Sequence, residues 1–274
     1  MDHERKGYDS RAVRFSVARP KTGVALHYAE QGEPGGEPLL LLHGYADSWF
    51  SWSRVLPLLP PSFHAYAIDQ RGHGDSERPA SGYGMADFAA DVIAFMEYAG
   101  LPPVTLVGHS MGSFIARRVA VEAPERVKRL VLIGAGANSR TAALVELEQE
   151  VRELTDPVAE DFIRAFQATT NPTPRDFMEG IIAESKKLPA RVWRDALAGL
   201  AAPDASPRGD IETPALVLHG GNDGVFPMSE QDLLMASLPN GVLKVYPGIG
   251  HGVHWEAAER VAEDLVGFIA GART

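Results

Sequence analysis

The chain of 274 residues contains no cysteine. Disulfides, thiolate catalysis, zinc–cysteine sites and iron–sulfur clusters are therefore excluded. Long hydrophobic runs are missing too: the longest strongly apolar run lies near Leu39–Leu42, far short of the roughly 20 residues that span a bilayer. The first six residues are mostly charged and no apolar segment follows them, so we expect no secretory signal and a cytoplasmic protein.

Positive charge is in the minority. Lys and Arg number 26 against 36 Asp and Glu, which gives a formal net charge of −10. A surface of this sign offers no electrostatic footprint for nucleic acid or for an anionic membrane, so we expect neither partner. The length fits one large domain, or one domain with an insertion.

Along most of the chain, apolar runs of strand length alternate with amphipathic stretches of helix length. Strands are predicted at residues 23–30, 39–42, 64–68, 104–107, 130–133, 215–218 and 243–245. Apolar residues at three- and four-residue spacing predict helices at 85–99, 113–123, 229–238 and 256–270. This alternation predicts an α/β fold with a mostly parallel sheet and helices on both faces. The first dozen residues are expected to form a loosely ordered extension.

Residues 139–210 interrupt this alternation. No convincing strand occurs there, and prolines separate four helical patterns, at 141–154, 157–169, 175–185 and 190–200. We expect this segment to form a helical cap over the carboxyl edge of the sheet. The core domain would then consist of residues 1–138 and 211–274.

The sharpest local signal is a Gly-x-Ser-x-Gly motif at residues 108–112, centred on Ser110. It follows a predicted strand and opens a predicted helix, which is the context expected of a nucleophile elbow. Such a tight turn exposes the serine Oγ, and the helix behind it presents N–H groups and a positive dipole end to a developing oxyanion. Ser110 is therefore the candidate nucleophile.

A serine nucleophile needs a base, and the base needs an orienting acid, in the chain order Ser, acid, His for this elbow. Asp223 and His251 each follow a predicted strand and satisfy this order. Loop 134–139, where some hydrolases place the acid, has no carboxylate. His254 remains an alternative base. Three other aspartates precede the serine and break the order: Asp69, Asp75 and Asp87.

The oxyanion hole is expected to combine two backbone N–H groups. One belongs to Met111, directly after the nucleophile, and the other comes from the loop after the strand at 39–42. In that loop Gly44 lets the backbone turn inward, which makes the N–H of Tyr45 the second candidate donor. His43 is expected to brace the loop through hydrogen bonds.

With these residues assembled, the chain resembles the α/β-hydrolase fold superfamily over nearly its whole length. The resemblance rests on His43-Gly44, the stretch 69–76, the motif at 108–112, Asp223 and His251. It implies an eight-stranded sheet with a helical cap after the sixth strand. It also implies that the stretch 69–76 is a structural loop near the site.

Within that superfamily the sequence looks most like capped carboxylesterases, lactonases and cofactor-free haloperoxidase-type enzymes. Haloalkane dehalogenases and epoxide hydrolases attack with a carboxylate, whereas this elbow carries Ser110. The expected function is hydrolysis of carboxylic esters or lactones of small to medium acyl chain: Ser110 attacks, His251 moves the proton, Asp223 fixes the imidazole tautomer and water releases the acyl group. No metal or organic cofactor is required.

Three alternatives stay open. A carbon–carbon bond hydrolase would use the same site, and so would a haloperoxidase or perhydrolase, with peroxide in place of water. The non-enzymatic alternative is a hydrolase-fold protein that binds a small ligand under the cap. Apolar side chains expected to line the substrate pocket are Trp49, Phe162, Phe166, Met178, Ile182 and Trp193.

Overall fold

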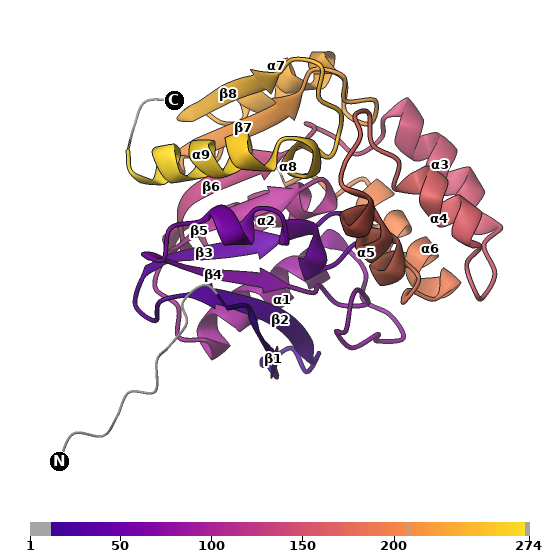
Figure 1. Ribbon diagram of the computed structural model, residues 1–274, viewed down its shortest axis with the longest axis horizontal. Helices are drawn as coiled ribbons and strands as arrows, with labels where there is room; N and C mark the ends of the chain where they lie inside the picture. The colour runs from indigo at the N-terminus through magenta and orange to yellow at the C-terminus, as the bar shows by residue number, and fades with distance from the viewer. Residues whose placement is uncertain (1–11, 208, 272–274) are drawn as a thin grey trace.

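A computed structural model describes residues 12–207 and 209–271, and its centre is one eight-stranded sheet (Figure 1). The strand order is β1-β2-β4-β3-β5-β6-β7-β8. Among the described strands, only β2 runs against its neighbours, since it pairs antiparallel with both β1 and β4 while the other pairs are parallel. The strands are β1 (Arg14–Ala18), β2 (Leu26–Gly32), β3 (Glu37–Leu42), β4 (Phe63–Ile68), β5 (Val104–His109), β6 (Val127–Ile133), β7 (Ala215–Gly220) and β8 (Gly241–Tyr246).

Helices cover both faces of this sheet. Helices α1 (Met85–Tyr98), α2 (Met111–Glu122) and α7 (Met228–Ala236) contribute to a core on one face. Helix α9 (Ala258–Ile269), with the short 3-10 helices η1 (Trp49–Trp52) and η2 (Leu56–Leu58), contributes to the core on the other face. A third 3-10 helix, η3 (Pro124–Arg126), precedes β6. The predicted α/β-hydrolase fold is confirmed.

Strand β3 shows why its sequence is an unbroken run of leucine. Successive side chains of a strand point to opposite faces. Leu40 and Leu42 accordingly enter the core of α1 and α2, while Leu39 and Leu41 enter the core of α9. All four are fully buried, as expected for a parallel strand covered on both faces.

Between β6 and β7, the residues that the structure describes form four helices and no strand. They are α3 (Ala142–Arg152), α4 (Glu160–Phe166), α5 (Arg175–Ser185) and α6 (Ala190–Ala201). They gather beyond the carboxyl ends of the parallel strands (Figure 1). This group of four helices is called the α3–α6 layer below.

The bounds of the predicted elements shift by up to three residues, and three differences have a clear structural reason. Strand β1 was not predicted; it is a short edge strand whose Phe15 and Val17 are about half exposed, so burial does not mark it. Strand β2 begins three residues later than expected, because a turn closed by the Gly23 N–H and the Pro20 carbonyl precedes it. The predicted helix at 256–270 is broken at Ala257, which separates α8 (Val253–Glu256) from α9.

The extension expected over the first dozen residues lies almost wholly outside the described residues. The charged N-terminal segment, from which we predicted that no secretory signal is present, also lies outside them. Among the helices that the structure does describe, none is long and apolar enough to cross a membrane.

Candidate active site

Ser110 occupies the sharp turn between β5 and α2. Its φ and ψ angles are 50° and −118°, a conformation that a non-glycine residue adopts only under strain. The flanking glycines make the turn possible. A Cβ on Gly108 would lie 2.2 Å from the Gly112 carbonyl oxygen, and one on Gly112 would lie 2.4 Å from the Leu42 carbonyl oxygen. Helix α2 therefore lies so close to β5 and to the end of β3 that neither position has room for a side chain larger than that of glycine.

Asp223 and His251 are hydrogen-bonded to each other. The His251 Nδ1 lies 2.9 Å from the Asp223 Oδ2, while the Asp223 Oδ1 accepts hydrogen bonds from the N–H groups of Val225 and Phe226. Burial alone would raise the pKa of Asp223, but the charge of His251 and these three hydrogen bonds outweigh it and lower the pKa. The ionised carboxylate only accepts hydrogen bonds, so the His251 Nδ1 carries the proton and its Nε2 is left as a base.

The turn after β3 lies against the serine. A Cβ on Gly44 would come within 2.9 Å of the His109 ring and 3.3 Å of the Ser110 Cβ. In the part of the chain that the structure describes, no hydrogen-bond partner is found for the backbone N–H of Tyr45. The N–H of Met111 is the first of helix α2 and has no partner within its own helix. Within the described chain, both N–H groups thus lack a hydrogen-bond partner.

His43 braces this turn from below. Its Nδ1 bonds to the Gly44 carbonyl at 2.7 Å and its Nε2 accepts from the Gln70 N–H at 3.0 Å. The α3–α6 layer supports the turn from above: the Ala46 carbonyl lies 2.8 Å from the Ser185 Oγ and 3.4 Å from the Gln167 Nε2. Ala46 has φ 58°, which these contacts hold in place.

A cavity of about 400 Å³ opens over these groups. Its lining includes Ser110, His251 and Tyr45 from the core and residues of α3 and α4 from the α3–α6 layer. The serine, the histidine and the turn therefore line one cavity between the core and the α3–α6 layer. A small molecule in this cavity can touch all three.

A model of the α/β hydrolase fold matches residues 37–258 of the chain. The chain belongs to the α/β-hydrolase fold family. It is 30% identical over 270 residues to a non-heme haloperoxidase of Rhodococcus erythropolis, which covers 90% of this chain and 96% of that protein. It is also 30% identical over 268 residues to a bifunctional esterase/perhydrolase of Acinetobacter calcoaceticus. That alignment covers 91% of this chain and 97% of the relative. These relatives place the chain among the enzymes of this superfamily.

A solved structure gives the same fold. The enol-lactonase from Burkholderia xenovorans LB400 has a TM-score of 0.79 with this chain at 21% sequence identity, covering 93% of this chain and 100% of that one.

His254, the alternative base, does not belong to the cavity lining. It is fully buried, with its Nε2 bonded to the Ser51 hydroxyl at 2.8 Å, and burial lowers its pKa to about 3. Among the described residues no carboxylate is hydrogen-bonded to it, so nothing orients it as a base. His251, in contrast, is paired with Asp223 and reaches the cavity.

Of the six apolar side chains predicted to line the pocket, Phe166 alone belongs to the cavity lining. The structure places the other five elsewhere. Trp193 is fully buried against Tyr45 and Phe166, and Phe162 packs on the same ring of Trp193. Apolar spacing marks the buried face of a helix, but it does not tell a face turned to a neighbouring helix from one turned to a cavity.

The remaining three of these side chains pack where α5 and η1 meet the core. Ile182 is buried in the core beneath the α3–α6 layer. Met178 packs on the cluster around Phe177 and Trp255. Trp49 makes edge contacts with Phe15 on β1 and with Phe50. None of the three belongs to the cavity lining.

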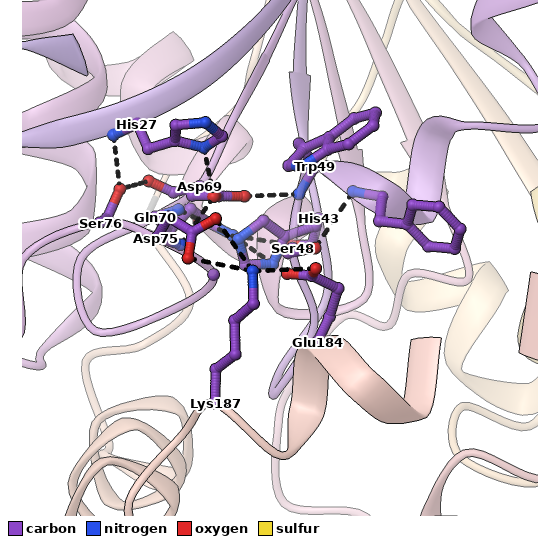
Figure 2. A network of polar contacts seen from close by, with 12 residues as sticks. His27, His43, Ser48, Trp49, Asp69, Gln70, Asp75, Ser76, Glu184 and Lys187 are labelled. Carbon is purple, nitrogen blue, oxygen red and sulfur yellow. Dashed lines mark hydrogen bonds and ion pairs between the residues drawn. The ribbon is translucent and has the colours of Figure 1, made fainter. Parts of the chain in front are cut away.

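The stretch 69–76 forms a polar network beside the site (Figure 2). The Asp69 carboxylate accepts from the Trp49 N–H at 2.7 Å and the Asp75 N–H at 2.9 Å, and His27 Nδ1 lies 2.7 Å away. Lys187, just past α5, pairs with Asp75 at 2.9 Å and with Glu184 at 3.0 Å. The network therefore fixes η1 to the sheet and ties the α3–α6 layer to the core.

The same network contains the one group of possible metal ligands found among the described residues. One ligand atom from each of His27, Asp69 and Asp75 lies within 4.8 Å of the others. Both Asp69 oxygens already accept N–H groups and the Lys187 ammonium matches the charge of Asp75. The protein's own donors account for the cluster, so we assign no metal to it.

Sequence reasoning missed several polar residues of the cavity lining. Asp47 comes from the same turn as Tyr45, Gln167 from the end of α4, and Glu146 and Glu150 from α3. For Asp47 a signal existed, since it lies three residues after Gly44. For the residues of the α3–α6 layer none did, because their orientation depends on how the four helices pack.

Proposed function

We propose that the protein is a serine hydrolase that cleaves carboxylic esters or lactones of small to medium acyl chain through an acyl-enzyme intermediate. One observation carries the proposal: His251 is held through Nδ1 by Asp223 and shares a cavity with Ser110, which stands on a strained turn. We also propose that residues 139–210 act as a cap that limits substrate size.

In this mechanism Ser110 Oγ attacks the carbonyl carbon while His251 Nε2 takes the hydroxyl proton. Asp223 stabilises the imidazolium that forms and keeps its orientation. The developing oxyanion accepts hydrogen bonds from the N–H groups of Tyr45 and Met111. His251 then gives its proton to the leaving alkoxide, and the carbon–oxygen bond of the ester breaks.

Deacylation runs through the same groups. A water molecule loses a proton to His251 and attacks the acyl carbon, and the proton returns to Ser110 as the acid leaves. With hydrogen peroxide in place of water the product is a peroxy acid. This second activity is favoured by one observation, the 30% identity over 268 residues with a bifunctional esterase/perhydrolase.

The test is a substrate panel. It contains p-nitrophenyl esters of increasing chain length and acyl-homoserine lactones, each with water alone and with added hydrogen peroxide. We expect turnover by the native protein and a loss of about 10³-fold or more in kcat for Ser110→Ala, with unchanged thermal unfolding. Faster turnover of the lactones would identify a lactonase. Equal rates for the native protein and the variant on every substrate would refute the hydrolase proposal.

A further inference from the structure

The charge of the cavity lining is of one sign. In the described part of the chain, the residues that line it include four with a carboxylate and none with a lysine or arginine side chain. The four are Asp47, Glu146, Glu150 and Glu256. Their surroundings differ, and the difference shows which of them can act on a ligand.

Glu256 is already occupied. Its carboxylate accepts from the N–H groups of Gly250, Thr170 and Asn171 and from the Asn171 side-chain amide. These donors tie the loop before α5 to the loop that carries His251. Glu256 is therefore a structural residue, and its charge is dispersed over the donors.

Glu146 and Glu150 are exposed and lie four residues apart, on one side of α3 at the edge of the cavity. No ion pair is found for either within the described chain, whereas Glu148 on the same helix pairs with Arg152 at 2.9 Å. Like charges four residues apart repel each other and weaken a helix. Two carboxylates without an ion-pair partner in the described chain thus lie at the cavity, and their mutual repulsion lowers the stability of α3.

Asp47 lies deeper, on the turn that carries Tyr45. It is 1% exposed; its Oδ1 accepts from the Ser48 N–H at 2.8 Å, and its Oδ2 has no partner among the described residues. A buried acceptor without a donor is costly, and most buried polar groups in proteins are satisfied. Because Asp47 belongs to the cavity lining, its side chain lies next to the space that a bound ligand would occupy.

The charges around Asp47 favour a cation there. Burial raises the pKa of Asp47 to about 7, and the negative charges of Glu184 and Asp69 act in the same direction. The Ser51 hydroxyl and the Ser48 N–H oppose this rise, but Ser51 is itself hydrogen-bonded with His254 and Trp255. A cationic donor beside Oδ2 would supply both the missing hydrogen bond and the missing charge.

We propose that this cavity selects esters or lactones that carry a protonated amine and discriminates against substrates that carry a carboxylate, an inference that rests on the hydrolase function proposed above. Glu146 and Glu150 attract the cation to the cavity, and the unpartnered Asp47 Oδ2 accepts its N–H. Asp47 is three residues from Gly44, which contacts Ser110, so a fully extended chain would separate their Cα atoms by at most about 11 Å. The amine would lie within that range of the scissile carbonyl.

The test compares four butanoate esters that differ only in the alcohol. They are the 2-(dimethylamino)ethyl ester, a cation with an N–H; the choline ester, a cation without one; the uncharged 3-methylbutyl ester; and the 2-carboxyethyl ester, an anion. Initial rates are followed by proton release at neutral pH. We expect kcat/KM of the dimethylamino ester to exceed that of its uncharged isostere by about tenfold or more, with the choline ester between them and the anion slowest.

Variants distinguish the contribution of Asp47 from that of Glu146 and Glu150. Asp47→Asn should abolish the advantage of the N–H cation over the choline ester. The double variant Glu146→Gln/Glu150→Gln should reduce the rates of both cations, and about 1 M salt should have the same effect, because exposed charges are screened at that ionic strength. Glu148→Gln on the same helix is the matched control and should keep the native order of rates. The double variant lies on an exposed helix face, so it tests the inference even if Asp47→Asn fails to fold.

The outcomes distinguish this inference from the function on which it rests. If the uncharged ester is hydrolysed in a Ser110-dependent reaction and the cations gain nothing over it, the charge selectivity is wrong and the hydrolase function stands. An anionic ester that is hydrolysed as fast as the cations would also overturn the selectivity. If neither these esters nor the p-nitrophenyl esters are hydrolysed, the proposed function itself fails.

Discussion

Asp223 and Asp47 are both buried beside the same cavity, yet they have opposite electrostatic properties. Asp223 receives hydrogen bonds from two backbone N–H groups and from His251, and its pKa is lowered. Asp47 receives one from the Ser48 N–H and is also stabilised as an anion by the Ser51 hydroxyl, but its Oδ2 has no partner among the described residues and its pKa is raised to about 7. Burial pushes both pKa values upward, so the number of donors and the nearby charge decide the result. Asp223 is thereby held as an anion, whereas Asp47 can gain or lose a proton near pH 7.

The largest effect is expected from removing the charge that orients the histidine. Asp223→Asn preserves the shape of the side chain, but its amide can present an N–H to His251 Nδ1 and favour the wrong tautomer. We expect kcat/KM for a p-nitrophenyl ester to fall by about 10³- to 10⁴-fold with little change in fold. Asp210→Asn, at an exposed aspartate, is the control and should be fully active. Activity within a few-fold of the native level in Asp223→Asn would show that Asp223 does not orient the base.

Asp47→Asn is expected to change how stability depends on pH. The pKa of Asp47 is about 7 in the folded protein against an ordinary value of 3.8, so the folded state binds the additional proton between these values. Stability therefore falls as pH rises from about 4 to about 7, and removing the carboxyl group removes this loss. Relative to the native protein, the variant should gain up to about 4 kcal/mol of unfolding free energy over that range.

Urea unfolding of both proteins at several pH values measures this difference. Contributions from the buried histidines are common to both proteins and cancel in the comparison. Parallel curves, with a constant offset between the two proteins, would show that Asp47 is ionised throughout and would remove the contrast with Asp223.

The smallest effect is expected from Lys187→Met. This substitution changes the electrostatic potential at Asp47 without contact and should increase the difference in pKa between Asp47 and Asp223. Lys187 pairs with Glu184, whose charge raises the pKa of Asp47. Without the ammonium group, the pH at which Asp47 titrates should rise, while the partly exposed ion pairs contribute less than about 1 kcal/mol to stability. Lys128→Met, which breaks a similar ion pair with Glu37, is the control. An equal shift of the Asp47 titration in both variants would indicate a general charge effect.

Much of the fold follows from local sequence patterns. The leucines of β3 and the elbow at Ser110 are recognisable because burial on both faces and a tight strand-to-helix turn each demand particular residues at adjacent positions. Asp223 and His251 are predictable as a pair because parallel strands bring the loops after them to one edge.

The residues around the substrate space were less predictable. Trp193 and Ile182 have the apolar spacing of a pocket wall but pack against neighbouring helices. Asp47 has the sequence context of an ordinary turn aspartate, and nothing in the sequence shows that one of its oxygens would be buried without a donor. Both depend on how the α3–α6 layer sits on the sheet, which is set by contacts between residues more than 100 positions apart, such as Ser185 and Ala46.

The bond from Ser185 to the Ala46 carbonyl also bears on engineering this enzyme. Exchange of the segment between β6 and β7 for that of a relative is an obvious route to new substrates. Here that exchange would also take away Ser185 and Gln167, which hold the turn bearing the Tyr45 N–H in its left-handed conformation at Ala46. A chimaera that keeps these two side chains should retain the rate of the chemical step, and one that discards them should lose rate on every substrate, whatever the shape of its new pocket.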